Sequence, residues 1–182
     1  MKQLVALLRG INVGATGKGR KAVPMAELRA LAEDLGWKNA QTYIQSGNLV
    51  FDASTAAATA EQKLTAAIAD HFGFDVPVIV RPLEDLVRAE GECPFAAAAD
   101  ERPNLVHIGF AKEKVVKSAV AACIDYCTNG ERVAVKGQFI WSDCPNGVGR
   151  SKLTPAVLDR AFGSPVTMRN VKTLRALAAI AR

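Results

Sequence analysis

The chain has 182 residues, of which 49% are hydrophobic and 23% are charged. This length suits one domain or two small halves that share a core, and it buries roughly 70% of the unfolded surface, so folding requires neither disulfides nor a metal. No apolar run approaches the ~20 residues of a membrane-spanning helix, and the first residues lack the apolar length and the cleavage site of a signal peptide. We therefore expect a cytoplasmic protein with no membrane partner.

The net charge of +5 is unevenly distributed along the chain. Residues 1–26 carry +5 and residues 144–182 carry +6, so the middle of the chain must carry −6. If the two ends meet in the fold, they form one positive surface that suits an anionic partner. The alternative is that these charges lie on scattered, solvated helix faces.

The first stretch of the chain predicts a strand, a basic loop and a helix. The apolar run Leu4–Leu8 is typical of a buried strand. A loop containing four glycines and Lys18, Arg20 and Lys21 follows it. Apolar residues then recur at helical spacing from Met25, and Pro24 suits the first helical position because that position needs no N–H donor. A flexible basic loop that leads into a helix N-terminus is a favourable place for an anion.

The next elements complete a ferredoxin-like order over residues 1–82. Two short strands over 41–44 and 49–51 flank a turn. Thr59 and Gln62 have the spacing of a capping box at the start of a second helix. Val76–Val80 predicts a strand at a sheet edge, since it contains a proline. The resulting order β-α-β-β-α-β is the ferredoxin-like arrangement.

The second half, residues 83–182, repeats this order with additional helices. The predicted elements are a connecting helix over 83–89, a loop over 91–103, a strand over 104–110, a helix over 114–128 with Val116, Val120, Cys123 and Cys127 facing inward, a hairpin over 133–142, a helix that starts at Thr154 and Pro155, an extended segment over 165–168 and a final helix from 171. The predicted fold is therefore α+β, with two ferredoxin-like βαββαβ halves and an added C-terminal helix.

Five segments of the chain resemble the domain-of-unknown-function 1697 family. They are LLRGINVG at 7–14, KAVPMAELRAL at 21–31, TYIQSGNLVF at 42–51, NGVGRSKLT at 146–154 and TMRNVKTLRAL at 167–177. The resemblance extends over nearly the whole chain. It implies a small bacterial cytoplasmic protein with ferredoxin-like halves and no assigned activity, and it supplies no catalytic residues.

Two basic loops give the main functional hypothesis. The loop over 145–152 also contains glycines and basic residues and also leads into a helix, so each loop directs backbone N–H groups and cations in the same manner. We expect the loops to converge on a phosphate-bearing ligand, either a nucleotide-like small molecule or a nucleic acid. The candidate ligand-binding residues are Arg9, Asn12, Lys21, Arg150, Lys152 and Arg169.

Several alternatives remain open at the level of sequence. Ser46 or Ser151, beside the basic groups, could serve a transferase or hydrolase, although neither has a histidine partner at a diagnostic spacing. A third reading is a structural module that forms a homodimer through open sheet edges. The glycine pattern matches neither a P-loop nor a dinucleotide fingerprint, so no cofactor is expected.

The cysteines and aromatic residues do not add a second chemistry. Cys123 and Cys127 are four residues apart, which does not match the spacing of a structural zinc site, so we expect buried thiols and no metal. Tyr43 and Phe51 lie on strands that could stack RNA bases. However, the RNA-recognition signature is absent, and we assign these two side chains to the core.

Overall fold

The computed structural model describes residues 1–13 and 21–180. Lys18 and Arg20 of the first predicted loop lie outside the described residues. Backbone packing divides the chain into two compact units. Unit 1 comprises Met1–Leu86 together with Ile180, and unit 2 comprises Val87–Ala179. The halves expected from the sequence are residues 1–82 and 83–182.

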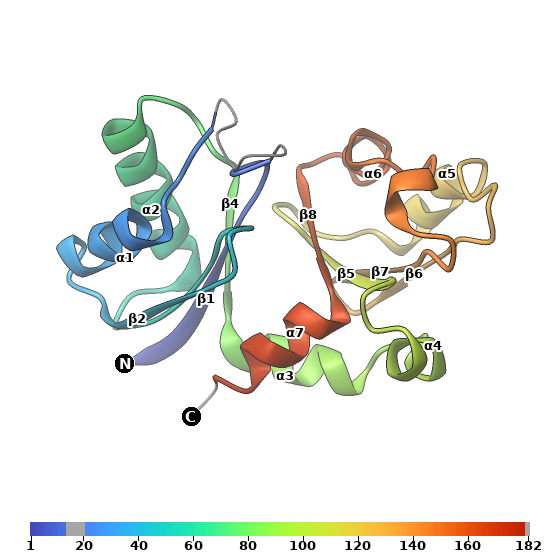
Figure 1. The fold of residues 1–182 in the computed structure, drawn as a ribbon, viewed down its shortest axis with the longest axis horizontal. Helices are drawn as coiled ribbons and strands as arrows, with labels where there is room; N and C mark the ends of the chain where they lie inside the picture. Colours follow the sequence, from blue (N-terminus) through green and yellow to red (C-terminus); the bar gives the residue numbers. More distant parts are fainter. Residues whose placement is uncertain (14–20, 181–182) are drawn as a thin grey trace. The chain divides into compact units, whose positions relative to one another are not determined.

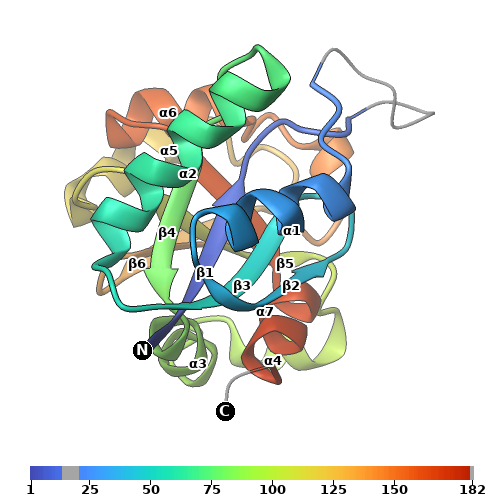
Figure 2. The same cartoon turned by 90° about the vertical axis from the view of Figure 1, so that its left-hand side faces the viewer.

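Unit 1 is one antiparallel sheet with two helices on one face (Figures 1 and 2). Its strands lie in the order β2-β3-β1-β4, so the first strand of the chain is central. The elements of this unit are β1 (Lys2–Leu8), α1 (Met25–Asp34), β2 (Lys38–Tyr43), β3 (Asn48–Ala53), α2 (Ala57–Phe72) and β4 (Val78–Pro82), and α3 (Leu83–Gly91) begins in unit 1 and ends in unit 2.

The core of unit 1 lies between the sheet and the two helices. Alternate residues of β1, such as Leu4 and Leu8, pack against Leu64 and Ile68 of α2 in this core, which follows from the two-residue period of a strand and the helical spacing of α2. Phe51 is buried and stacks on Trp37 with ring centroids 4.0 Å apart, as expected for a core residue.

Unit 2 repeats the same strand order in a second antiparallel sheet, β6-β7-β5-β8. The α+β prediction of two βαββαβ halves with an added C-terminal helix is therefore confirmed. The elements of unit 2 that follow α3 are α4 (Ala96–Glu101), β5 (Val106–Ala111), η1 (Lys117–Val120), α5 (Ala121–Ile124), β6 (Arg132–Lys136), β7 (Phe139–Asp143), η2 (Val148–Arg150), α6 (Pro155–Phe162), β8 (Val166–Asn170) and α7 (Val171–Ala178).

The two sheets protect one edge in the same way. β4 and β8 are edge strands, and each has a backbone N–H that binds a helix carboxylate: Val80 donates to Glu61 of α2, and Val166 donates to Asp159 of α6, both at 2.9 Å. A carboxylate on an edge N–H removes a donor that another strand could otherwise pair with. The predicted edge position of this strand is confirmed, although β4 begins at Val78 and Pro77 precedes it.

Four local predictions differ from the structure. Pro24 is the N-cap of α1 and not its first residue, and α2 starts at Ala57, so Thr59 is inside the helix and does not cap it. The segment predicted as a loop contains α4, since its run of alanines has the highest helix propensity. The predicted helix over 114–128 is only η1 and α5, in a stretch whose β-branched valines are weak helix formers; Cys123 is buried there, whereas Val116 is exposed.

A charged cluster in unit 2 is centred on one buried carboxylate. Asp143, at the end of β7, is 1% exposed, and Oδ2 accepts hydrogen bonds from Arg102 at 2.9 Å and Arg132 at 2.7 Å. Burial acts to raise the pKa of this carboxyl, but the hydrogen bonds from the two guanidinium groups outweigh it and lower the pKa. The Arg132 guanidinium also lies over the Phe95 ring, 4.6 Å from its centroid.

Candidate functional site

The segment from Cys144 to Thr154 is an ordered loop that joins β7 to α6. Gly147 has φ +87°, which favours glycine, and its N–H closes a turn on the Cys144 carbonyl at 2.9 Å. The Asn146 side chain donates to the Asn129 carbonyl at 2.9 Å, which ties the loop to the segment before β6. Thr154 then caps α6 by accepting from the N–H of Val157, and Pro155 follows, as the sequence predicts.

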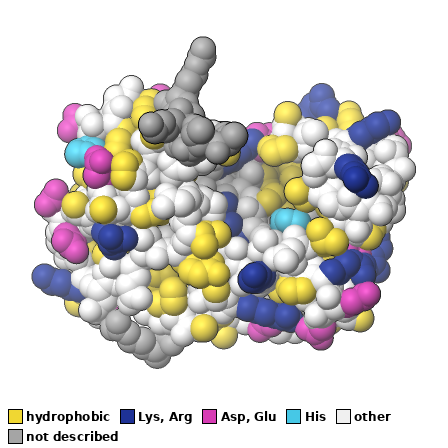
Figure 3. Space-filling view, viewed as in Figure 1, with side chains coloured by type: hydrophobic (Ala, Val, Ile, Leu, Met, Phe, Trp, Pro, Cys, Tyr) yellow, Lys and Arg dark blue, Asp and Glu magenta, His cyan; other side chains and the backbone are white. Residues whose placement is uncertain are grey.

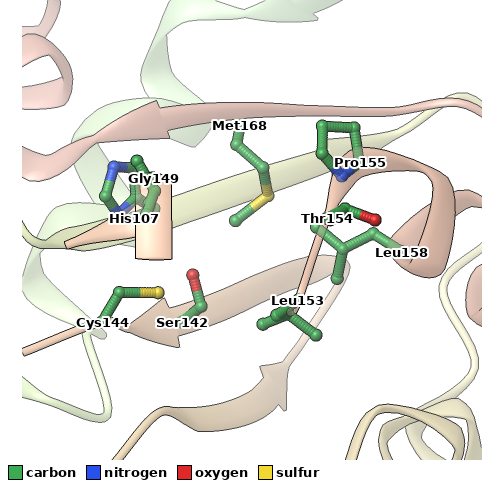
Figure 4. A pocket seen from close by; sticks show the side chains of 10 residues that line it. His107, Ser142, Cys144, Gly149, Leu153, Thr154, Pro155, Leu158 and Met168 are labelled. Carbon is green, nitrogen blue, oxygen red and sulfur yellow. The ribbon is translucent and has the colours of Figure 1, made fainter. Parts of the chain in front are cut away.

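This loop forms one wall of a cavity of about 320 Å³ inside unit 2 (Figure 4). Strands β5, β7 and β8 form the opposite wall. The lining is predominantly apolar and contains a few polar side chains, which is the usual composition of a small-molecule site, although the volume is near the lower end of such sites. The lining residues are His107, Ser142, Cys144, Val148, Gly149, Leu153, Thr154, Pro155, Leu158 and Met168.

Strand pairing brings the polar residues of the cavity together. His107 of β5 and Ser142 of β7 are direct partners in the antiparallel register, so their side chains leave the same face of the sheet. In Figure 4 the Ser142 hydroxyl points into the cavity toward Met168, and the Cys144 side chain points toward Ser142. No motif in the sequence marks Ser142 as a site residue. The only signal was a serine at an inward position of an otherwise apolar strand.

His107 is uncharged in this environment. Burial lowers its pKa, with a smaller opposing effect from the hydrogen bond to Leu105. Nδ1 lies 3.2 Å from the Leu105 carbonyl oxygen, which can only accept a hydrogen bond. Nδ1 therefore carries the proton, and Nε2 has a lone pair with no hydrogen-bond partner among the described residues.

Cys144 contributes a neutral thiol to the cavity. Burial raises its pKa to about 11, and the Ser142 hydroxyl opposes this effect only in part. A thiol with this pKa is protonated at neutral pH and is a poor nucleophile. All four cysteines are free thiols, and the described residues contain no group of His, Cys, Asp or Glu side chains that could hold a metal ion. The cavity therefore suits binding by packing and hydrogen bonds.

The predicted basic residues of unit 2 lie in different environments. Arg150 and Lys152 are exposed, and each is adjacent in sequence to a residue that lines the cavity, Gly149 and Leu153. Arg169 of β8 is instead 9% exposed, and burial lowers its pKa to about 10. Arg169 follows Met168 in the strand, so its side chain leaves the sheet on the face opposite the cavity.

The predicted residues of unit 1 brace the ends of the first loop. Asn12 has φ +52°; its side chain donates to the carbonyls of Val23 and Gln45 and accepts from the N–H of Val23, each at 2.9 Å. Lys21 donates from Nζ to the Asp75 carbonyl at 2.5 Å, and the backbone N–H of Arg9 donates to the Pro77 carbonyl at 3.0 Å. Asn12 and Lys21 thus have structural contacts. Anion binding by Arg9, Asn12 and Lys21 stays a prediction.

The two serines considered for catalysis support turns. Ser46 accepts from the Asn48 side chain at 3.1 Å, and Ser151 accepts from the N–H of Leu153 at 3.0 Å. Ser151 also lowers the pKa of the buried Glu131 carboxyl. A catalytic role for either serine stays a prediction.

Comparison with known proteins identifies a family and a similar solved structure, and neither has an assigned activity. No curated protein matches the chain. Among solved structures, a conserved bacterial protein, SP0830 from Streptococcus pneumoniae, is similar over 100% of this chain and 99% of its own, with 27% sequence identity and a TM-score of 0.73. Within the part of the chain that the structure describes, none of the helices is long and apolar enough to span a membrane. The model of a family described as protein of unknown function, DUF1697, matches residues 1–141, and the chain therefore belongs to the DUF1697 family.

Proposed function

We propose that the protein binds a small phosphate-bearing molecule in the cavity of unit 2. The uncharged part of the ligand occupies the cavity, and its phosphate lies at the rim beside Arg150 and Lys152. The observation that supports this proposal is that the glycine-rich basic loop, selected from sequence as an anion site, is itself a wall of a mostly apolar cavity within unit 2.

The electrostatics of the loop and cavity agree with this division. With His107 neutral, none of the ten lining residues carries a formal charge, so an anionic group finds no opposite charge inside the cavity to offset its loss of hydration. At the rim, the cations of Arg150 and Lys152 and the capped N-terminus of α6 all favour negative charge. Each contribution is modest at an exposed surface, so binding requires several of them together.

The face of unit 2 that is visible in Figure 3 favours a small molecule over a nucleic acid. In Figure 3 the Lys and Arg side chains over α5, α6 and β6 are spread across the visible surface and do not gather in one broad patch. A nucleic-acid partner would need several aligned phosphate contacts. With four such contacts, affinity should fall roughly a hundredfold between 50 and 200 mM salt. A ligand held mainly within the cavity should show a much weaker dependence.

The test is a thermal-shift screen of the full chain with inorganic phosphate, ribose 5-phosphate and nucleoside monophosphates. A ligand at a hundred times its dissociation constant stabilises the native state by about 2.7 kcal/mol, which is easily detected. The double variant Arg150→Ala with Lys152→Ala should lose this shift. Lys114→Ala with Lys136→Ala is the matched control, since both lysines are exposed and neither lines the cavity. Absence of a shift with every phosphate compound would refute the proposal.

A further inference from the structure

The hydrogen-bonding groups inside the cavity indicate which part of a ligand enters it. This inference rests on the proposed function, because it concerns the same cavity. The two groups that matter are Nε2 of His107 and the hydroxyl of Ser142, which are cross-strand neighbours on the sheet wall. Neighbouring polar groups on a rigid sheet suit a ligand with two adjacent, complementary atoms.

His107 presents an acceptor to the ligand. Its proton is on Nδ1, where the Leu105 carbonyl receives it, so Nε2 has only a lone pair to offer. The ring is half-buried in a strand, and it lines the cavity. A ligand that satisfies Nε2 must therefore bring an N–H or O–H donor. A purely apolar group, such as an acyl chain, would leave this nitrogen unpaired.

Ser142 presents a donor beside that acceptor. The Cys144 side chain points toward Ser142, and a hydrogen bond from the Ser142 hydroxyl acts to lower the pKa of this thiol. The neutral thiol is only a weak acceptor, so the Ser142 hydroxyl can donate instead to a stronger acceptor atom in the cavity, into which the hydroxyl points (Figure 4). The wall thus offers an acceptor and a donor side by side.

The other walls are suited to a flat apolar ring. Met168 lies on the sheet side, and Leu153 and Leu158 lie on the side of the loop and α6. A methionine thioether packs well against aromatic rings, and the two leucines can cover the other face of such a ring. A sugar alone would place several hydroxyl groups against these apolar side chains without partners.

We propose that the group in the cavity is a nucleobase, which makes the ligand a nucleoside monophosphate. An amino group or ring N–H of the base donates to His107, and the neighbouring ring nitrogen or carbonyl accepts from Ser142. Adjacent donor and acceptor atoms of this kind occur on the edges of nucleobases; in adenine, for example, the amino group lies next to a ring nitrogen. The phosphate remains at the rim beside Arg150.

The experiment measures binding of AMP, CMP, GMP, UMP and ribose 5-phosphate to the full chain by calorimetry. At least one nucleotide should bind ten times or more tightly than ribose 5-phosphate. His107→Phe retains a ring but removes the acceptor, and it should weaken that nucleotide about tenfold while leaving ribose 5-phosphate unchanged. His107→Gln, whose amide oxygen can accept, should retain part of the affinity. His71→Phe in unit 1 is the matched control, and circular dichroism verifies that each variant is folded.

The outcomes separate this inference from the proposed function. If ribose 5-phosphate binds as tightly as every nucleotide, the nucleobase assignment is wrong, while a phosphate ligand remains supported. If a nucleotide binds and His107→Phe, still folded, leaves its affinity unchanged, the assignment is likewise wrong. If none of the phosphate compounds binds, both proposals fail.

Discussion

Gly109 in the middle of β5 allows a quantitative test of how tightly the core of unit 2 is packed. Its backbone does not have the positive φ that favours glycine, so the need for glycine comes from space. A Cβ at this position would lie 2.5 Å from Sδ of Met168, 3.1 Å from Cβ of Ile140 and 3.2 Å from Cγ1 of Val166. We therefore expect Gly109→Ala to destabilise the protein.

The magnitude depends on which neighbours can move. The end of Met168 is flexible and can turn away, but Cβ of Ile140 is attached to β7 and moves only with that strand. Overpacking of this kind costs about 1–3 kcal/mol, and the reduced entropy of the unfolded chain returns about 0.4–1 kcal/mol. The net loss is about 1–2 kcal/mol. At roughly 2–4 °C per kcal/mol for a chain of this length, the melting temperature should fall by roughly 2–8 °C.

Urea unfolding and calorimetry measure this loss. The matched control is Gly91→Ala at the end of α3, where φ is not positive and no atom lies within 4 Å of the added Cβ, so the variant should be neutral or slightly stabilised. Since Met168 lines the cavity, its displacement in Gly109→Ala should also weaken any ligand bound there. If Gly109→Ala were as stable as the wild type, the packing argument would be wrong.

Three further substitutions test other parts of the structure. Asp143→Asn removes the charge held by Arg102 and Arg132 and should cost about 2 kcal/mol at pH 7 in urea unfolding, less than a fully buried pair because both arginines reach solvent. The pKa of Asp143 is lowered in the folded state, so the difference from wild type should shrink once the pH falls below the ordinary value of 3.8 and disappear as the pH falls through the lower folded-state pKa; a constant difference would contradict the pairing. Asn12 has a positive φ, and Asn12→Ala removes the three hydrogen bonds of its side chain. The free energy of unfolding should fall by about 1–3 kcal/mol, whereas equal stability would show that the amide is dispensable. Thr154→Ala removes the cap of α6 and should cost about 1 kcal/mol in thermal unfolding, with Thr154→Ser as the control that retains the cap.

Elements with both a periodic pattern and an end signal could be predicted from the sequence. In α6, Thr154 caps the start, Leu158 and Phe162 are buried, and Gly163 ends the helix with φ +67°, as expected. Gly73 ends α2 in the same conformation. Where only periodicity was present, as over 114–128, the apolar spacing did not distinguish a continuous helix from a 3₁₀ turn followed by a short helix.

The candidate site could be predicted only in part. Local composition identified the basic loop, which contains Arg150 and Lys152. The pairing of His107 with Ser142 depends on the register of β5 and β7, which are separated along the chain by η1, α5 and β6. No local spacing encodes such a contact. Arg169 and Asn12 have contacts within the fold, since one is buried in a strand and the other is bonded to two backbone segments, and anion binding by either residue stays a prediction.

The strand order of unit 2 has a consequence for how the cavity forms during synthesis. β5 is the first strand of this sheet, yet one of its neighbours is β8, the last. Met168 of β8 supplies part of the cavity wall, so the cavity cannot be complete until β8 has been synthesised and has left the ribosome. Contacts of such long sequence separation form slowly. A C-terminal truncation before Val166 should therefore abolish ligand capture even if the preceding hairpin of β6 and β7 still forms.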